Sequence, residues 1–283
     1  MVNPTNPTIS TADSRRPGAL PGGPALLARL ERAFTGKQAH YRIEDELPDA
    51  AARADALASA RALLGSPSWE ARNAGVKLLG LLQAPESAAA IVAVLRDRRR
   101  AAWYKRLLGG DFEQVGFIRR NALTALARLG ETGPDVEDVI IRALDDPYYE
   151  ARVEAARTLA ILGPGFSEGA RRLAVAGLTR RLRDRWLEVA AAAAESLGRI
   201  GREADAVPAL VALGTHRYWM VRAAALNGLC TLVERGEVAE GNALERQVRG
   251  FVLAATDFRP EFTIKSAYAR LLAAIGRQTG GPR

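Results

Sequence analysis

Few side chains in this sequence could perform covalent or metal chemistry. The 283 residues contain two histidines, His40 and His216, and one cysteine, Cys230. One cysteine excludes an internal disulfide framework and any zinc or iron–sulfur site held by several cysteines. Neither a nucleophile-elbow motif nor a Gly-rich phosphate loop accompanies the histidines. The sequence therefore predicts no catalytic residue, no metal ligand and no small-molecule cofactor, and it favours a non-enzymatic protein.

Binding chemistry is better represented, above all in the stretch 95–114, LRDRRRAAWYKRLLGGDFEQ. Six cations flank two adjacent aromatic residues, and Asp97 is the only acid before Asp111. Such a patch could hold a phosphate backbone while its rings stack on bases, or dock on an acidic protein surface. The alternative is a solvated helix whose aromatic pair packs on its own unit. The candidate partner-binding residues here are Arg96, Arg98, Arg99, Arg100, Trp103, Tyr104, Lys105 and Arg106.

A second group of candidates recurs along the chain, where four aromatic residues each stand three positions before a basic one. Aromatic stacking with guanidinium contacts is what extruded bases or single strands require. Alternatively, the aromatics cap the core and the arginines pair with aspartates of neighbouring turns, for which Asp145, Asp146, Asp184 and Asp257 are suitably placed. The pairs are Trp69 and Arg72, Tyr149 and Arg152, Trp219 and Arg222, and Phe262 and Lys265. From this group and its repeats, the candidate partner-binding residues are Trp69, Trp219, Arg119, Arg152 and Arg222.

These residues are ordered by a repeat, which appears when the chain is aligned on six anchor positions. Seven positions after the anchor every copy has leucine, and apolar residues also stand one position before and ten after it. This is the spacing of one helical stripe, so each copy predicts an amphipathic helix of roughly four turns. The anchors are Arg72, Arg119, Arg152, Ala190, Arg222 and Lys265, and the leucines are Leu79, Leu126, Leu159, Leu197, Leu229 and Leu272.

Another apolar-periodic stretch precedes each anchored helix. Turn sequences such as DDPYY (145–149) and GTHRYW (214–219) separate the two, because their Gly, Pro and Asp residues interrupt a helix. The predicted unit is therefore helix, turn, helix, with a period typical of two-helix solenoids. The first helices are expected over 51–64, 86–95, 134–144, 168–183, 204–213 and 242–256.

Over residues 50–276 the columns resemble HEAT repeats of the bacterial kind also found in phycobilin lyases, with valine–arginine, alanines and leucine–glycine. The resemblance implies an all-α, right-handed α-solenoid of about six helix pairs. It also places the basic run 171–186 on the convex face, where a solvated surface is the simpler interpretation. In the fourth copy Ala190 replaces the anchor arginine and opens five alanines, so we expect unusually close helix packing or a change in curvature there.

Several catalytic families share this architecture, and most need residues that this chain lacks. Deoxyhypusine hydroxylases bind iron through His-Glu dipeptides, whereas Tyr41 and Arg217 follow the two histidines here. Epoxyqueuosine reductases need iron–sulfur clusters, which one cysteine cannot ligate. Alkylpurine DNA glycosylases, basic proteins that use aromatic side chains, remain an alternative. A bilin-lyase-like protein is a third hypothesis, although the repeat does not itself encode that activity.

Composition and charge set the remaining expectations. Hydrophobic residues make up 48% of the chain but aromatic residues only 6%, a composition that favours helix. The formal net charge of +8 allows an anionic partner. No apolar stretch is long enough to span a membrane and no signal-peptide pattern opens the chain, so a cytoplasmic location is expected. The expected organisation is a flexible tail over 1–24, an N-terminal cap over 25–48, the solenoid over 49–276 and a flexible C-terminus over 277–283.

A repeat without a catalytic set predicts a non-catalytic scaffold. We expect it to bind a protein partner through its concave face, with the 95–114 stretch adding selectivity. The alternative partner is nucleic acid, bound by a HEAT-like module or a glycosylase-like enzyme.

Overall fold

The computed structural model describes residues 47, 49–96, 111–254 and 261–279, and these are arranged as α-helices and short 3-10 helices without a strand. The expected tail over 1–24 and nearly all of the expected cap over 25–48 lie outside them. Helix α14 (Glu261–Thr279) runs into the segment expected to be a flexible C-terminus. Within the described ranges, no helix combines the length and the apolar character needed to cross a membrane.

The helices follow one another in pairs. The first helices of the pairs are α2 (Ala50–Leu64), α4 (Ala88–Arg96), α7 (Pro134–Ala143), α9 (Glu168–Arg181), α11 (Glu203–Val211) and α13 (Gly241–Val248). The second helices are α3 (Trp69–Leu81), α6 (Asp111–Leu129), α8 (Tyr149–Leu162), α10 (Leu187–Ile200), α12 (Trp219–Glu234) and α14. Three 3-10 turns join successive elements: η2 (Pro85–Ser87), η3 (Gly163–Gly165) and η4 (Ala212–Thr215). Five of the six expected first helices agree with these bounds to within two residues.

The sixth expected helix, 242–256, is wrong in its second half, because α13 ends at Val248. The chain turns back towards an earlier turn, and the N–H of Val252 donates to the carbonyl of Gly214 over 3.0 Å. The ring of Phe251 packs directly on Gly214, where a Cβ would collide with it. A contact between two units, invisible in the local periodicity, therefore ends the helix.

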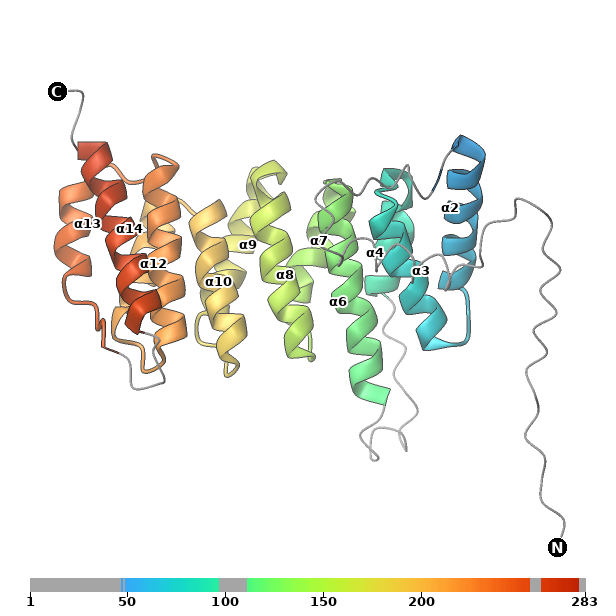
Figure 1. Cartoon of the computed structure of the whole chain (residues 1–283), viewed down its shortest axis with the longest axis horizontal. Helices are drawn as coiled ribbons and strands as arrows, with labels where there is room; N and C mark the ends of the chain where they lie inside the picture. Colours follow the sequence, from blue (N-terminus) through green and yellow to red (C-terminus); the bar gives the residue numbers. More distant parts are fainter. Residues whose placement is uncertain (1–46, 48, 97–110, 255–260, 280–283) are drawn as a thin grey trace, which may run out of the picture.

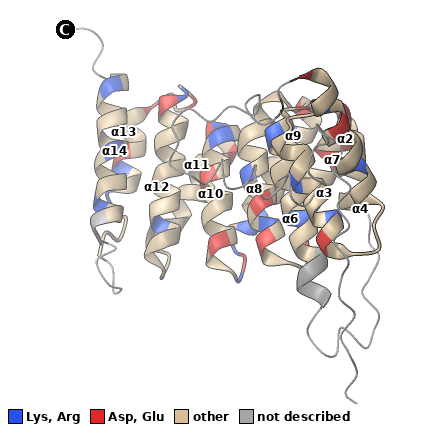
Figure 2. Cartoon of the chain, turned by 45° about the vertical axis from the view of Figure 1, so that its right-hand side comes forward, with Lys and Arg blue, Asp and Glu red and all other residues tan. Residues whose placement is uncertain are grey.

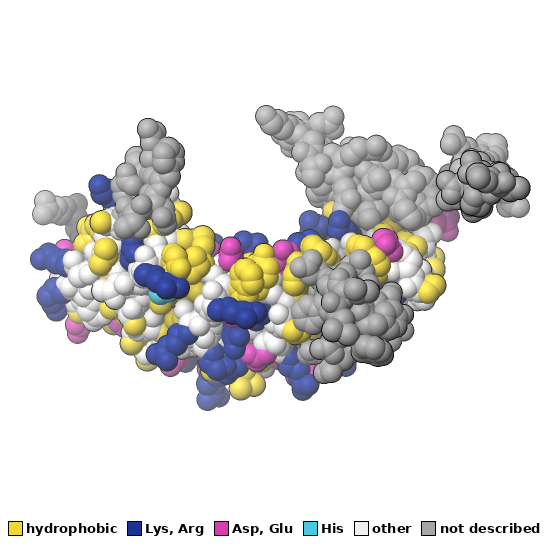
Figure 3. All heavy atoms as spheres, turned by 90° about the horizontal axis from the view of Figure 1, so that it is seen from below, with side chains coloured by type: hydrophobic (Ala, Val, Ile, Leu, Met, Phe, Trp, Pro, Cys, Tyr) yellow, Lys and Arg dark blue, Asp and Glu magenta, His cyan; other side chains and the backbone are white. Residues whose placement is uncertain are grey.

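Two layers of helices run along the array (Figure 1). The second helices form one layer, in which α3, α6, α8, α10, α12 and α14 each contact the next. The first helices from α4 to α11 contact one another in the same way and form the other layer. The array is arched, and its hollow side is the side of the second helices (Figure 3). We call this surface the hollow side.

The hydrophobic core lies between the two layers and follows the predicted columns. Five of the six aligned leucines have no exposed surface, and Leu272 is partly buried in the last helix. Since burying one leucine side chain contributes about 1.5–3 kcal/mol, this column is a large favourable contribution to the packing of the two layers. The buried leucines are Leu79, Leu126, Leu159, Leu197 and Leu229.

The close packing expected around the alanine-rich copy is present between α10 and α12. A Cβ placed on Gly198 would lie 2.6 Å from the Cα of Gly228, and a Cβ on Gly228 would lie 2.5 Å from the carbonyl oxygen of Ala194. Ala193 and Ala194 are fully buried beside them. Side chains of minimal size therefore let these two backbones touch.

We predict that Gly198→Ala destabilises the protein by about 1–3 kcal/mol, because an added methyl group forces α10 and α12 apart. Urea unfolding followed by circular dichroism measures the change. Gly169→Ala is the matched control, since no atom lies within 4 Å of a Cβ at that position of α9, and it should leave stability unchanged or raise it. Equal stability of the two variants would contradict the close packing.

Candidate functional site

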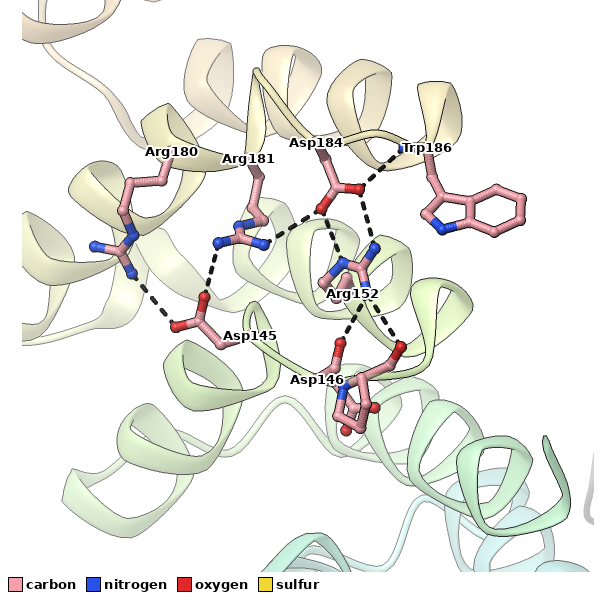
Figure 4. A network of polar contacts seen from close by, with 8 residues as sticks. Asp145, Asp146, Arg152, Arg180, Arg181, Asp184 and Trp186 are labelled. Carbon is pink, nitrogen blue, oxygen red and sulfur yellow. Dashed lines mark hydrogen bonds and ion pairs between the residues drawn. The ribbon is translucent and has the colours of Figure 1, made fainter. Parts of the chain in front are cut away.

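The turns that join the first and second helix of each pair lie along one edge of the array. We call this edge the turn edge; it comprises residues 65–68, 144–148, 182–186 and 212–218. Two buried ion pairs each connect a second helix to the turn of the next unit. Arg119 of α6 binds Asp146 through two hydrogen bonds of 2.6 and 2.8 Å, and Arg152 of α8 binds Asp184 through two of 2.9 Å (Figure 4). Each arginine thus holds the turn of the next unit.

The same aspartates also bind the backbone N–H of the residue just before the helix that follows them. The backbone N–H of Tyr148 donates to Asp146 over 2.8 Å, and the N–H of Trp186 donates to Asp184 over 3.0 Å. Arg152 closes the network by donating to the carbonyl of Asp146 over 2.8 Å. One carboxylate therefore satisfies both a guanidinium from the preceding unit and a backbone N–H of its own turn.

The environment of Asp184 favours its charged form. Burial alone would raise the pKa of this carboxyl, but the hydrogen bonds from Arg152 and from the backbone of Trp186, together with the charges of Arg152 and Arg181, hold its pKa below the ordinary value. Its side chain is only 4% exposed. Removing its charge would leave Arg152 buried without its counter-ion.

The anchor arginines are thus used inside the stack. Arg72 donates to the carbonyls of Ser66 and Pro67 over 2.8 and 2.9 Å. Arg222 donates to the carbonyl of Ala254 over 2.5 Å and also to that of His216. Of the anchors that the sequence proposes for partner binding, Arg119 is 8%, Arg152 7% and Arg222 4% exposed. Little of their surface is open to a partner.

Aromatic side chains form a chain along the turn edge. Tyr148 packs between Phe117 and Tyr149, with ring centroids 5.6 and 5.7 Å apart. Tyr149 then stacks almost parallel on Trp186, 4.2 Å away. Trp186 is 39% exposed and points away from the ion-pair network (Figure 4).

The turn aromatics that the sequence proposes for partner binding are less exposed than Trp186. Trp69 and Trp219 are partly buried and pack against the core, and the side chain of Phe262 lies outside the described residues. The exposed ring is Trp186, which periodic alignment misses because it stands four positions, not three, before its anchor. The signal that could have found it is the adjacent Arg-aromatic pair, Arg185 and Trp186, which recurs as Arg217 and Tyr218.

The two basic stretches, 95–114 and 171–186, differ in how much of each the structure describes. Arg96 at the end of α4 pairs with Asp135 of α7, while the other candidates of the 95–114 stretch lie outside the described residues: Arg98, Arg99, Arg100, Trp103, Tyr104, Lys105 and Arg106. In the run 171–186, several arginines share carboxylates. Arg171 and Arg172 pair with Glu168, and Arg180 and Arg181 pair with Asp145.

Reactive groups are sparse in the part of the chain that the structure describes. It contains no group of three or more His, Cys, Asp or Glu side chains that could hold a metal ion. Burial, with the nearby carboxylate of Glu234, raises the pKa of the Cys230 thiol, which keeps it protonated. His216 accepts a 3.3 Å hydrogen bond from the N–H of Tyr218 through Nδ1 and so helps to shape its own turn.

No family model matches the chain, and no curated protein matches it. Among solved structures, it is similar to three engineered proteins of the Northeast Structural Genomics Consortium. One is 16% identical, with a TM-score of 0.51 over 78% of this chain and 98% of its own. Another is 18% identical, with a TM-score of 0.48 over 78% and 96%, and the third is 18% identical, with a TM-score of 0.48 over 90% and 69%. The similarity with a TM-score of 0.51 supports a helical-repeat fold and carries no information about activity.

We predict that Asp184→Asn lowers the free energy of unfolding by about 3–5 kcal/mol at pH 7, because Arg152 loses its buried counter-ion. The wild-type carboxylate, whose folded pKa is depressed, contributes fully above its unfolded pKa of about 4, and its contribution is lost as the pH falls through the folded pKa. The stability difference between wild type and variant should therefore shrink on acidification. Denaturant unfolding at pH 7 and in steps below pH 4 measures it. A difference that does not change with pH would contradict the ion pair.

Proposed function

We propose that the protein is a non-catalytic scaffold that binds a protein partner on its hollow side, with the 95–114 stretch adding contacts. In this proposal the array is a right-handed α-solenoid of about six HEAT-like helix pairs in the cytoplasm. The repeat columns and the two-layer packing of the helices support the architecture. The surface chemistry of the hollow side supports the choice of partner.

The observation that carries the proposal is a polar column on the second helices. It stands five positions after each anchor, on the side of the helix away from the leucines. Its members are partly or fully exposed, and neighbours bind one another: Asn227 donates to Glu195 over 3.4 Å, and Arg270 donates to Asn227 over 2.7 Å. The column consists of Lys77, Thr124, Arg157, Glu195, Asn227 and Arg270.

This surface suits a protein better than a polyanion, because its charge is mixed. The second helices α8 and α10 carry Glu150, Glu188 and Glu195 as well as Arg157, and Arg120 of α6 pairs with Glu150 over 2.5 Å. Figure 2 shows positive and negative residues interleaved across the array. A phosphate backbone would meet carboxylates along the middle of the hollow side, whereas a protein surface can present matching charges of both signs.

We predict that reversing two charges of the column, by Arg157→Glu with Glu195→Arg, weakens capture of the partner at least about tenfold, which corresponds to about 1.4 kcal/mol. Replacing Arg98, Arg99 and Arg100 by alanine should weaken it as well. The tagged full-length chain is used to capture proteins from a nuclease-treated lysate of the native cell, and a captured protein is then titrated against each variant.

The matched control is Arg142→Ala with Arg172→Ala and Arg246→Ala, which removes three exposed charges from the layer of first helices. It should leave capture unchanged, and circular dichroism should report equal melting temperatures for all variants. Capture that occurs in an untreated lysate but not in the nuclease-treated lysate would identify nucleic acid as the partner. Capture that survives both sets of substitutions would contradict the proposed surface.

A further inference from the structure

A pocket of about 750 Å³ opens between the end of α9 and the end of α11, at the turn edge. Leu182, Ala212 and Leu213 give it an apolar lining, and Arg183 and His216 stand among its polar residues. The pocket thus lies between two consecutive turns, 182–186 and 212–218. It can accept an apolar side chain of a bound segment.

In each of the two turns that border the pocket, an arginine directly follows a lining residue, Asp184 or His216, and its guanidinium lies near the next aromatic ring. The guanidinium carbon of Arg185 is 5.8 Å from the ring centroid of Trp186, and that of Arg217 is 4.4 Å from that of Tyr218. The two pairs occupy the same positions of consecutive repeats, five and four residues before the anchor. A guanidinium held against a ring keeps its N–H groups available for a carboxylate and loses less freedom on binding.

The charge of this site is not balanced locally. Arg183, Arg185 and Arg217 are exposed, and among the described side chains none of the three has a carboxylate partner. The one acid of the turn, Asp184, is already bound by Arg152 and Arg181 and is nearly inaccessible. Figure 3 shows hydrophobic and Lys or Arg side chains gathered on the face of the molecule that carries the turns. The site is therefore complementary to a ligand with negative charge.

The geometry favours carboxylates over nucleic-acid bases. Bases bind single-strand sites by stacking on open aromatic faces, but Tyr149 covers one face of Trp186 and Arg185 lies towards the ring, while Arg217 lies over Tyr218. Packed helices are about 8–10 Å apart, which sets the spacing between equivalent backbone positions of consecutive units. Three residues of a peptide in the extended polyproline II conformation span about 9 Å, and the first and fourth side chains of such a peptide lie on the same face.

We propose that this pocket and its two Arg-aromatic pairs bind an extended acidic segment of the protein partner. Two carboxylates about three residues apart contact Arg185 and Arg217, and an apolar side chain between them enters the pocket. The inference rests on the proposed function, because it assumes that the partner is a protein.

The test is a fluorescence-anisotropy titration of the full-length chain against a fluorescein-labelled nine-residue peptide. The peptide carries Glu at its fourth and seventh positions and Leu at its fifth, and a second peptide has Gln in place of both Glu. We expect Arg185→Ala with Arg217→Ala to weaken binding of the Glu peptide at least about tenfold. The corresponding lysine variant should also weaken it, since lysine keeps the charge but loses the planar bidentate contact.

Arg142→Ala with Arg246→Ala removes the same charge elsewhere and should leave the affinity unchanged. Failure of the wild-type chain to bind the Glu peptide, equal affinity for the Gln peptide, or equal loss in the control variant would overturn the inference. Preferential binding of a fluorescein-labelled oligo-thymidine that Arg185 and Arg217 control would overturn it in favour of nucleic acid. Partner capture that is lost with the hollow-side variants but kept by the Arg185 and Arg217 variant would reject this site alone.

Discussion

The buried arginine–aspartate pairs between consecutive units are the constraint on which much of the middle of the array depends. Arg119 binds Asp146 and Arg152 binds Asp184, and each carboxylate also accepts a hydrogen bond from the backbone N–H of the residue just before the next second helix. Because a buried charge must keep its partner, neither turn can move without the other. Helix stacking and turn geometry are therefore fixed together, in addition to the non-directional packing of the leucine column.

This internal use of the anchor arginines decides which side chains remain outside. The anchor arginines Arg152 and Arg222, four residues after the turns, are drawn inward, whereas Arg183, Arg185 and Arg217, within the turns, stay exposed. The stack of Tyr149 and Trp186 links two units at the same edge. The array thus presents a polar column of mixed sign on its hollow side and a more positive, aromatic border along its turns, and we propose that these two surfaces bind different parts of one protein partner.

Periodicity predicts what repeats, and here it predicts the helices, the leucine column and the close packing near Ala190. It also indicates the aspartate partners of the anchor arginines, because Asp146 and Asp184 each stand six residues before the anchor of their own unit. Where the anchor is Ala190 rather than an arginine, the next unit has His216 at this position in place of an aspartate. Contacts between units are harder to predict from the sequence. The early end of α13 depends on Phe251 meeting Gly214, and the exposed Trp186 depends on a stack across two turns, neither of which one helix encodes.

A double-mutant cycle measures how strongly the Arg152–Asp184 pair couples neighbouring units. Arg152→Ala, Asp184→Ala and the double variant are unfolded in urea together with the wild-type chain at pH 7. A coupling free energy of at least about 2 kcal/mol is expected for a buried pair in direct contact. A value below about 0.5 kcal/mol, the range of independent sites, would contradict the account.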